Sequence, residues 1–257
     1  MAQDANALIG RPAWIDLSSS DPAASRAFYA GLFGWHVEVS PDPQYGGYAM
    51  ATLDGEDVAG IGPLQSPQAP TAWMIYVGTT DADGLATQVQ AAGGNVIAPP
   101  FDVGGQGRMA VFQDPSGAFI SAWQPQAMSG FGRLGPNTFG WAELSARGVD
   151  RAVPFYEAVF GWTHRSSDMP DGSAYIEFLS GDESLAGAME MNSMVPAAVP
   201  SYWMAYFSVA DVDASNAAAL SGGAREMVPP RDFPGGRLAI VSDPQGAVFG
   251  LIKLRPR

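Results

Sequence analysis

The sequence contains no cysteine, a single lysine (Lys253) and only two histidines in 257 residues. The absence of cysteine excludes disulfides, thiolate metal sites and a cysteine nucleophile. Lysine and arginine together number 13, against 26 acidic residues, which gives a formal net charge of -13. A field of this sign repels nucleic-acid phosphates and anionic membrane surfaces, and no local basic patch in the sequence offsets it. We therefore expect no nucleic-acid partner.

Long apolar runs are also absent. No stretch approaches the ~20 apolar residues that span a bilayer, and the start "MAQDANALIGRP" lacks the basic residues and apolar run of a signal peptide. We expect a cytoplasmic protein that does not associate with membranes. The composition, 47% hydrophobic and 15% charged, is ample for a sizeable core.

The sequence is a tandem repeat. The segment "FYAGLFGW" from Phe28 returns as "FYEAVFGW" from Phe155, 127 residues later. Further matches are "PTAWMIYVGTTDAD" with "PSYWMAYFSVADVD" and "GRMAVFQDPSGAFI" with "GRLAIVSDPQGAVF". We predict one module over residues 8–125, a linker rich in Gly, Pro and Ser over 126–136, and a second module over 137–257.

Each module divides again into two similar units. A tryptophan-bearing strand followed by an Asp-led helix occurs at Trp14, Trp73 and Trp203, whereas the instance at Trp141 has Gly148 in place of the Asp. Strand-like segments and a "DPSG"-type hairpin follow each helix. The pattern predicts a β-α-β-β-β unit used four times, and hence an α+β fold in which the aromatic octapeptides pack in the core.

Four segments carry a family resemblance: "SSDPAASRAFYAGLFGW", "RGVDRAVPFYEAVFGW", "FQDPSGAFISAW" and "VSDPQGAVFGLI". They resemble the vicinal oxygen chelate superfamily, which includes glyoxalase I, extradiol dioxygenases, fosfomycin-resistance enzymes and bleomycin-binding proteins. The tandem arrangement is similar to a bacterial subgroup with two modules. The resemblance implies tandem glyoxalase-like modules, whose four units form two cup-shaped half-barrel sheets with helices outside and a ligand inside each cup. It does not fix function, because the superfamily contains both enzymes and binding proteins.

The resemblance also implies a divalent metal held by His, Gln or Glu on the inner face of each sheet. The matching positions hold other residue types in both modules: Trp14 and Trp141, Met74 and Met204, Ser121 and Gly250. Indole and thioether groups do not replace the nitrogen and oxygen ligands of such metals. The two histidines, His36 and His164, are not at equivalent positions, and we expect them at the surface. We predict no metal and no other cofactor.

Strand alternation indicates what each cup contains instead, because residues two apart share a face. If Trp14 faces the cup, Asp16 does too, and Trp141 likewise brings Glu143. Each cup then has an aromatic and thioether-lined wall with one carboxylate and one phenol. The candidate catalytic residues are Asp16, Glu143, Tyr76 and Tyr206. The candidate ligand-binding residues are Trp14, Trp141, Met74, Met204, Ser121 and Trp123. The alternative is that the aromatic residues fill a closed core.

Two arginines repeat at equivalent positions. Arg108 and Arg237 each follow a glycine and precede an apolar run. An arginine can hold a carboxylate or phosphate of a ligand, and we include both among the candidate ligand-binding residues. The alternative is that each pairs with a neighbouring acid at the sheet edge.

Three classes of function fit these observations. The preferred hypothesis is a glyoxalase/bleomycin-resistance-like protein that binds a small organic molecule in aromatic-lined cups without the usual metal. The alternative is a metal-independent lyase, isomerase or epimerase in which Asp16 or Glu143 acts as acid and base. A scaffold with filled cups is the third. A metal-dependent glyoxalase or dioxygenase is disfavoured by the ligand positions. The partner is expected to be a small-molecule ligand, and the protein a monomer or homodimer.

Overall fold

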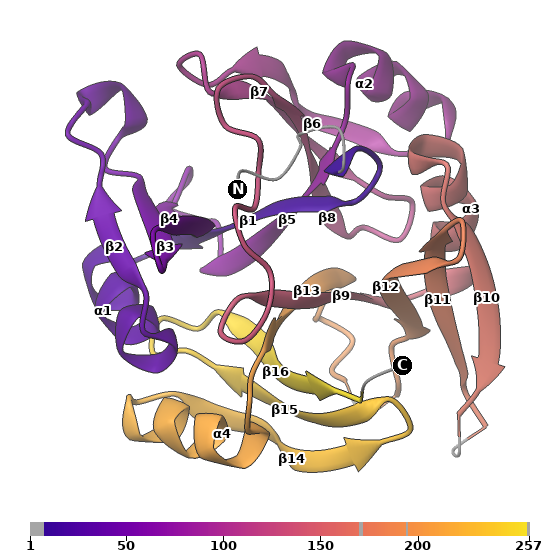
Figure 1. Cartoon of the computed structure of the whole chain (residues 1–257). Helices are drawn as coiled ribbons and strands as arrows, with labels where there is room; N and C mark the ends of the chain where they lie inside the picture. Colours follow the sequence, from indigo (N-terminus) through magenta and orange to yellow (C-terminus); the bar gives the residue numbers. More distant parts are fainter. Residues whose placement is uncertain (1–7, 170–171, 194, 256–257) are drawn as a thin grey trace.

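The computed structural model describes residues 8–169, 172–193 and 195–255, and over these residues the chain forms two eight-stranded sheets (Figure 1). We call the part from β1 to β8 module 1 and the part from β9 to β16 module 2. The elements of module 1 are β1 (Pro12–Ser19), α1 (Pro22–Phe33), β2 (His36–Val39), β3 (Ala49–Leu53), β4 (Glu56–Pro63), β5 (Ala72–Gly78), α2 (Ala82–Ala91), β6 (Asn95–Asp102), β7 (Gly107–Gln113) and β8 (Phe119–Pro125). Those of module 2 are β9 (Phe139–Ala146), α3 (Val149–Phe160), β10 (Thr163–Asp168), β11 (Ala174–Ser180), β12 (Glu183–Glu190), β13 (Tyr202–Ser208), α4 (Val212–Ser221), β14 (Arg225–Phe233), β15 (Gly236–Ser242) and β16 (Val248–Leu254).

The predicted unit is confirmed, since each module is two successive β-α-β-β-β units. The strand order in module 1 is β2-β3-β4-β1-β5-β8-β7-β6, and module 2 repeats it. The first strands of the two units, β1 and β5, run antiparallel at the centre of the sheet. Each of them pairs in parallel with the last strand of its own unit, β4 or β8. The α+β class and the tandem glyoxalase-like arrangement are therefore confirmed.

The helices begin where the sequence places a capping residue, with one exception. The carboxylates of Asp21, Asp81 and Asp211 accept hydrogen bonds from the first turns of α1, α2 and α4. Helix α3 begins after Gly148, which has no capping side chain. The carboxylate of Glu190, at the end of β12, accepts hydrogen bonds there from the backbone N–H of Gly148 at 2.9 Å and of the next residue at 2.8 Å. A cap from a different element thus preserves the third unit.

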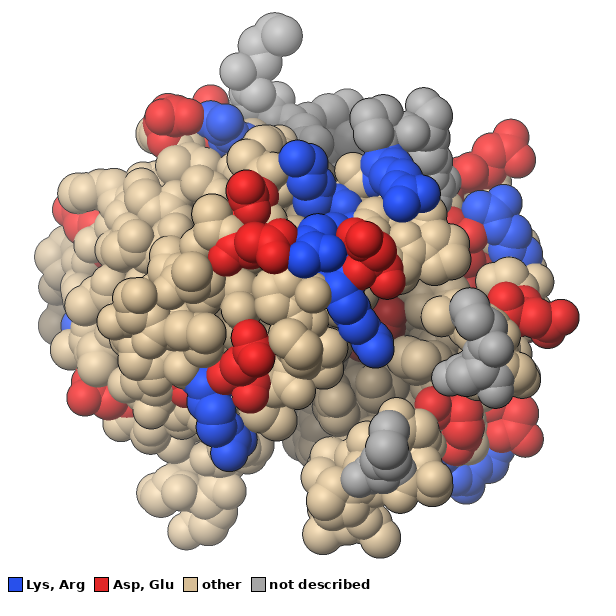
Figure 2. Space-filling view, turned by 90° about the horizontal axis from the view of Figure 1, so that it is seen from below, with Lys and Arg blue, Asp and Glu red and all other residues tan. Residues whose placement is uncertain are grey.

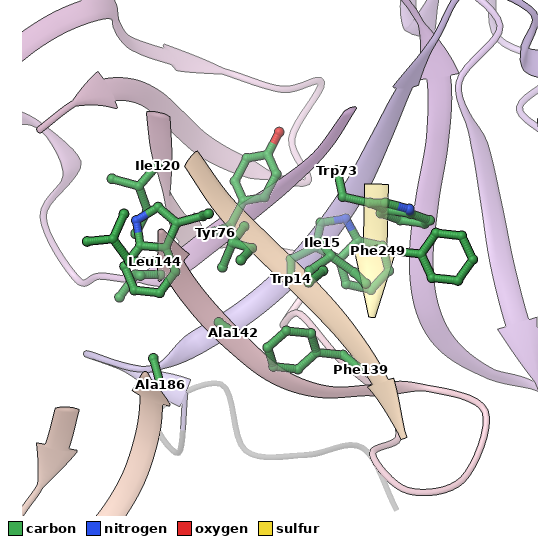
Figure 3. Close-up of a cluster of buried hydrophobic side chains, with 14 of the residues drawn as sticks. Trp14, Ile15, Trp73, Tyr76, Ile120, Phe139, Ala142, Leu144, Ala186 and Phe249 are labelled. Carbon is green, nitrogen blue, oxygen red and sulfur yellow. The ribbon is translucent and has the colours of Figure 1, made fainter. Parts of the chain in front are cut away.

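The two modules share one hydrophobic core. Side chains from both modules lie in the same cluster of buried residues, with Trp73 from module 1 near Phe249 from module 2, and Ile120 near Leu144 (Figure 3). The ring centroids of Trp73 and Phe207 (module 2) are 5.1 Å apart. Trp73 lies on the sheet face opposite to its neighbour Met74. The face with Trp73 is therefore used to join the modules, and Met74 lies on the other face.

The repeated octapeptides link the modules reciprocally. Tyr29 of α1 is fully buried, and its hydroxyl donates to the carboxylate of Asp243, in the β15–β16 hairpin of the other module, at 2.9 Å. In the same way, Tyr156 of α3 donates to Asp114, in the β7–β8 hairpin of module 1, at 2.8 Å. The core role predicted for these segments is confirmed. Their tyrosines also bond two buried carboxylates of the opposite module.

On the face shown in Figure 2, basic and acidic side chains lie next to one another. Among the described residues, no helix is long and apolar enough to cross a membrane.

Candidate functional site

Most of the candidate residues of each module lie on one face of its sheet. We call the face with Asp16 cup 1 and the face with Glu143 cup 2. In module 1 the loop after edge strand β2 meets the loop after edge strand β6, where the Tyr45 hydroxyl donates to the Gly104 carbonyl at 3.2 Å. The sheet therefore curls until loops from its two opposite edges touch.

The strand register brings several candidates of cup 1 together. Trp14 on β1 lies opposite Tyr76 on β5, and Asp16 lies opposite Met74. Tyr76 in turn lies beside Ser121 on β8. Because directly paired residues point to the same side of a sheet, these five side chains share the face of cup 1.

The carboxylate of cup 1 is held by phenol groups. The hydroxyl of Tyr76 donates to Oδ2 of Asp16 at 2.9 Å, and that of Tyr48 contacts the same oxygen at 3.5 Å. The indole Nε1 of Trp14 donates to the Tyr48 hydroxyl at 3.1 Å. Tyr48 lies over Gly60, where a Cβ would be 1.7 Å from the tyrosine hydroxyl oxygen. Within the described part of the chain, no donor reaches Oδ1 of Asp16, and this oxygen is free for a ligand.

Cup 2 repeats the network with a glutamate. The hydroxyl of Tyr206 donates to Oε1 of Glu143 at 2.9 Å, and that of Tyr175 donates to Oε2 at 3.1 Å. Trp141 donates to the Tyr175 hydroxyl at 3.1 Å. A Cβ on Gly187 would again clash with the tyrosine above it. Each carboxylate oxygen of Glu143 thus accepts a hydrogen bond from one phenol, whereas in Asp16 both phenols bond to the same oxygen.

Burial changes the acidity of both carboxyl groups. Loss of water around Asp16 raises its pKa from 3.8 to about 7, although the hydrogen bonds from Tyr76 and Tyr48 favour the ionised form. Burial also raises the pKa of Glu143, against the hydrogen bonds from its two tyrosines and the positive charge of Arg231. The pKa values of the tyrosines rise well above 10, chiefly through burial, so they remain protonated donors. Asp16 is therefore a carboxyl group that can exchange its proton near neutral pH.

The remaining candidates in the cups differ in how much of each side chain is exposed. Trp14 is only 3% exposed and packs against the linker residue Phe131, with ring centroids 5.7 Å apart. The indole of Trp123 is also buried and donates to the Met128 carbonyl of the linker at 3.0 Å. Ser121 and Met204 are buried as well. Met74 and Trp141 are half-buried, so only these two of the six leave substantial area for contact.

The two repeated arginines lie away from Asp16 and Glu143. Arg108 follows the alternation of β7 on the face covered by α2, where it forms ion pairs with Asp83 at 2.9 Å and Asp102 at 3.0 Å. Arg237 forms the same kind of pairs with Asp213 of α4 and Asp232 of β14. The structure thus has the edge pairing that the sequence left as the alternative, and it does not bring these arginines into the cups.

The positions that the family pattern reserves for metal ligands do not form a metal site. In cup 1 these positions supply an indole, a thioether and a hydroxyl beside the carboxylate of Asp16. The Oδ2 atom of this carboxylate already accepts hydrogen bonds from two phenols. No group of three or more His, Cys, Asp or Glu side chains comes together in the described residues. His36 and His164 are exposed, and His164 Nδ1 lies 2.7 Å from the Glu157 carboxylate. This donor set does not fit a divalent metal bound in the family manner.

Two surface hollows occur elsewhere, at the contacts between helices of different modules. One, of about 660 Å³, lies between α1 and α4 and includes Phe28 and Leu32. The other, of about 220 Å³, lies between α2 and α3 and includes Phe160. Neither includes Asp16 or Glu143, which lie on the curved faces of the sheets.

Sequence reasoning missed Tyr48 and Tyr175 as members of the site. Both occupy equivalent positions in the repeat, which was a usable signal. Tyr48 precedes β3, however, so strand alternation could not give its direction. The repeated glycines at positions 60 and 187 were the second signal, because each leaves the space that its tyrosine occupies.

Comparisons with known proteins agree with the geometry. The family model described as "Glyoxalase/Bleomycin resistance protein/Dioxygenase superfamily" matches residues 11–121 and 138–251. The chain is 40% identical over 254 residues to a protein of Mycobacterium tuberculosis named "Putative glyoxylase CFP32", with 96% of each chain covered. It is 39% identical over 261 residues to "Anthracycline biosynthesis protein DnrV" of Streptomyces peucetius, covering 96% of this chain and 94% of the relative.

Solved structures show the same fold at low sequence identity. A Mn(II)-bound glyoxalase from Novosphingobium aromaticivorans superposes with a TM-score of 0.67 at 17% identity, covering 95% of this chain and 82% of the other. The 2,3-dioxygenase LapB from Pseudomonas sp. KL28 gives 0.68 at 15% identity, covering 95% and 91%. The family model spans both modules and the relatives match over nearly their whole length, so the chain belongs to the glyoxalase/bleomycin resistance protein/dioxygenase superfamily.

Proposed function

We propose that this chain binds a small, uncharged organic molecule with hydroxyl or carbonyl oxygens in cup 1, without a metal. The observation that carries this proposal is the Asp16 carboxyl group, which two phenols orient through Oδ2 while Oδ1 has no donor in the described residues. An oriented, partly desolvated acceptor of this kind forms strong hydrogen bonds with a ligand hydroxyl, and when protonated it donates to a ligand carbonyl.

The apolar surroundings of cup 1 support an uncharged and largely apolar ligand. Phe101 on β6 and Phe119 on β8 are 46% and 43% exposed and occupy the same sheet face as Ser121 and Met109. Exposed aromatic side chains beside a half-buried carboxyl are typical of a ligand-binding surface. The net charge of -13 disfavours an anionic ligand in this cup.

A second candidate function, a metal-independent lyase, isomerase or epimerase, is favoured by the pKa of Asp16. A carboxyl group with a pKa of about 7 is present in both acid and base forms at neutral pH. Asp16 could then remove a proton from a carbon beside a carbonyl and return it to another position. Tyr76 donates its hydroxyl hydrogen to Asp16, so its role in such a step is to position the base rather than to polarise the substrate oxygen.

The names of the relatives suggest which compounds to test. One relative is named as a glyoxylase and another as an anthracycline biosynthesis protein. Anthracyclines are planar, polycyclic compounds with hydroxyl and carbonyl oxygens, and such a body would suit the exposed rings of cup 1. A hydroxyanthraquinone is therefore the first probe, and a small 2-oxoaldehyde is the second.

The test is a titration of chelator-treated protein with the hydroxyanthraquinone, followed by the quenching of tryptophan fluorescence. We expect saturable binding that Asp16→Asn weakens about tenfold or more, because a hydrogen bond to a charged group is lost. The matched variant Glu143→Gln should leave binding in cup 1 unchanged. Binding that requires added Mn²⁺ would contradict the metal-free proposal, and no binding of either probe would favour the scaffold alternative.

The same proteins distinguish binding from catalysis. Incubation of the 2-oxoaldehyde or another enolisable probe in D₂O reports proton transfer as exchange of C–H for C–D. An enzyme predicts exchange that is lost in Asp16→Asn more strongly than affinity is lost. Unchanged exchange in this variant would exclude Asp16 as the base.

A further inference from the structure

Cup 2 differs from cup 1 at matched positions around the shared network. Arg231, opposite Leu238, stands where module 1 has Phe101 opposite Met109. Tyr202 at the start of β13 stands where β5 has an alanine. The two cups therefore keep the same carboxylate and phenols but differ in the charge of their walls.

The guanidinium of Arg231 belongs to the face of cup 2. Its neighbour Asp232 pairs with Arg237 on the face covered by α4, so alternation along β14 directs Arg231 to the opposite face. Its strand partner Leu238 packs in the apolar cluster of cup 2. The positive charge of Arg231 also acts on Glu143, where it partly offsets the rise in pKa that burial causes. Since β14 is the edge strand, the curl of the sheet must carry Arg231 toward Glu143.

Arg231 is a cation of cup 2 that is available to a ligand. It is exposed, and in the described residues no carboxylate lies within ion-pair distance of it. By contrast, Arg165 on β10 pairs with Glu177 at 2.6 Å, and Arg237 pairs with two aspartates. In a chain with a net charge of -13, an arginine that has no ion-pair partner in the described residues is a specific place for an anion.

An apolar wall lies beside this arginine. The buried residues of the cup 2 cluster are Met204, Tyr206 and Ile252. The half-buried residues packed on them are Trp141, Tyr202, Phe233, Leu238, Ile240 and Val248. This cluster is separate from the main core, and its rings and aliphatic groups can contact the flat body of a ligand.

We propose that cup 2 binds an aromatic monocarboxylate, with the carboxylate on Arg231 and the ring on the wall that contains Trp141 and Tyr202. The ligand carries one negative charge because the neighbouring Glu143 would repel a doubly charged group such as a phosphate ester. This inference extends the proposed function to the second module, and the two cups then accept ligands of different charge.

The experiment is calorimetric titration of the full chain with 2-naphthoate and with its uncharged analogue 2-naphthamide, at pH 7 and low salt. We expect one naphthoate site per chain, binding more tightly than naphthamide. Arg231→Gln should weaken naphthoate binding at least about tenfold and leave naphthamide unchanged. Arg231→Lys should keep most of the affinity. The matched control is Arg225→Gln, which removes an exposed arginine at the other end of the same strand, where its charge does not act on Glu143, and should have a much smaller effect.

Phe101→Arg provides the reciprocal test, since it introduces the cation at the matched position of cup 1 and should create a second naphthoate site. The inference is overturned if naphthoate shows no saturable binding, if naphthamide binds equally well, or if Arg231→Gln and Arg225→Gln have equal effects. Failure of the cup 1 proposal is recognised separately, because Asp16→Asn changes binding of the hydroxyanthraquinone and not of naphthoate.

Discussion

The pH dependence of stability in the variant Asp16→Asn tests the environment of the cup 1 carboxyl group directly. The amide has nearly the same shape and can still accept the hydroxyl hydrogens of Tyr76 and Tyr48 through its oxygen. It cannot ionise, however. The variant therefore removes the titration of this one group while preserving most of its packing.

The magnitude follows from the pKa of Asp16, which rises from 3.8 in the unfolded chain to about 7 in the folded protein. Because the folded-state pKa is the higher one, the folded protein holds a proton that the unfolded chain releases. The stability that this proton contributes is fully present below pH 4 and is lost as the pH rises through 7. A shift of about three pH units corresponds to about 4 kcal/mol in the free energy of unfolding. Asn at this position does not titrate, so the free energy of unfolding of Asp16→Asn does not fall in this way. Relative to the wild type, it should therefore rise by about 4 kcal/mol from pH 4 to pH 8.

Urea unfolding at pH 4, 5, 6, 7 and 8, followed by tryptophan fluorescence, measures this difference. Other carboxyl groups titrate in both proteins and cancel in the comparison. The control is Glu38→Gln, which replaces an exposed carboxyl group on β2 that water already surrounds. If Asp16→Asn and the wild type differ by the same free energy at pH 5 and pH 8, the carboxyl group is not desolvated and the reasoning about cup 1 is refuted.

Three further predictions concern the contacts that shape the fold and the site. Tyr29→Phe removes the phenol that bonds the buried Asp243 across the modules, and we expect calorimetry to show a loss of about 1–3 kcal/mol. Glu190→Ala removes the cap of α3 and should cost about 1 kcal/mol in urea unfolding. Gly60→Ala places a methyl group where a tyrosine hydroxyl lies, so the carboxyl of Asp16 should lose this donor, and carbon NMR should record a further rise of its pKa.

Much of the fold could be predicted because the same pattern of strands and helices occurs in both halves of the sequence. The repeat located the strands and helices, and the capping aspartates gave the helix starts. Alternation along β1 and β5 also predicted that Asp16 and Tyr76 share one face, where the structure shows them hydrogen-bonded at 2.9 Å. These features depend on local patterns or on a single strand pairing, which a sequence can reveal.

Other features depend on curvature and on contacts between distant segments. The bond from Tyr29 to Asp243 joins residues 214 positions apart, and no local pattern encodes it. The linker residue Phe131 packs on Trp14 and removes most of that indole from a ligand, although composition indicated only a linker between the modules. Arg231 lies on an edge strand, and only the curl of the sheet relates it to the carboxylate of cup 2.

The two cups also show how a duplicated network can acquire different chemistry through few changes. In Asp16 one carboxylate oxygen accepts the hydrogen bonds from both phenols. In Glu143, which has one more methylene, each carboxylate oxygen accepts a hydrogen bond from one phenol. The first arrangement leaves Oδ1 of Asp16 without a donor in the described residues, as the proposed binding of a neutral ligand requires. The second occupies both oxygens, and the opposing wall supplies a cation in place of a phenylalanine. Under the binding proposed for cup 2, exchange of the two carboxyl side chains alone should therefore not exchange ligand preference, because the charge proposed to hold the ligand lies on β14 and not on β9.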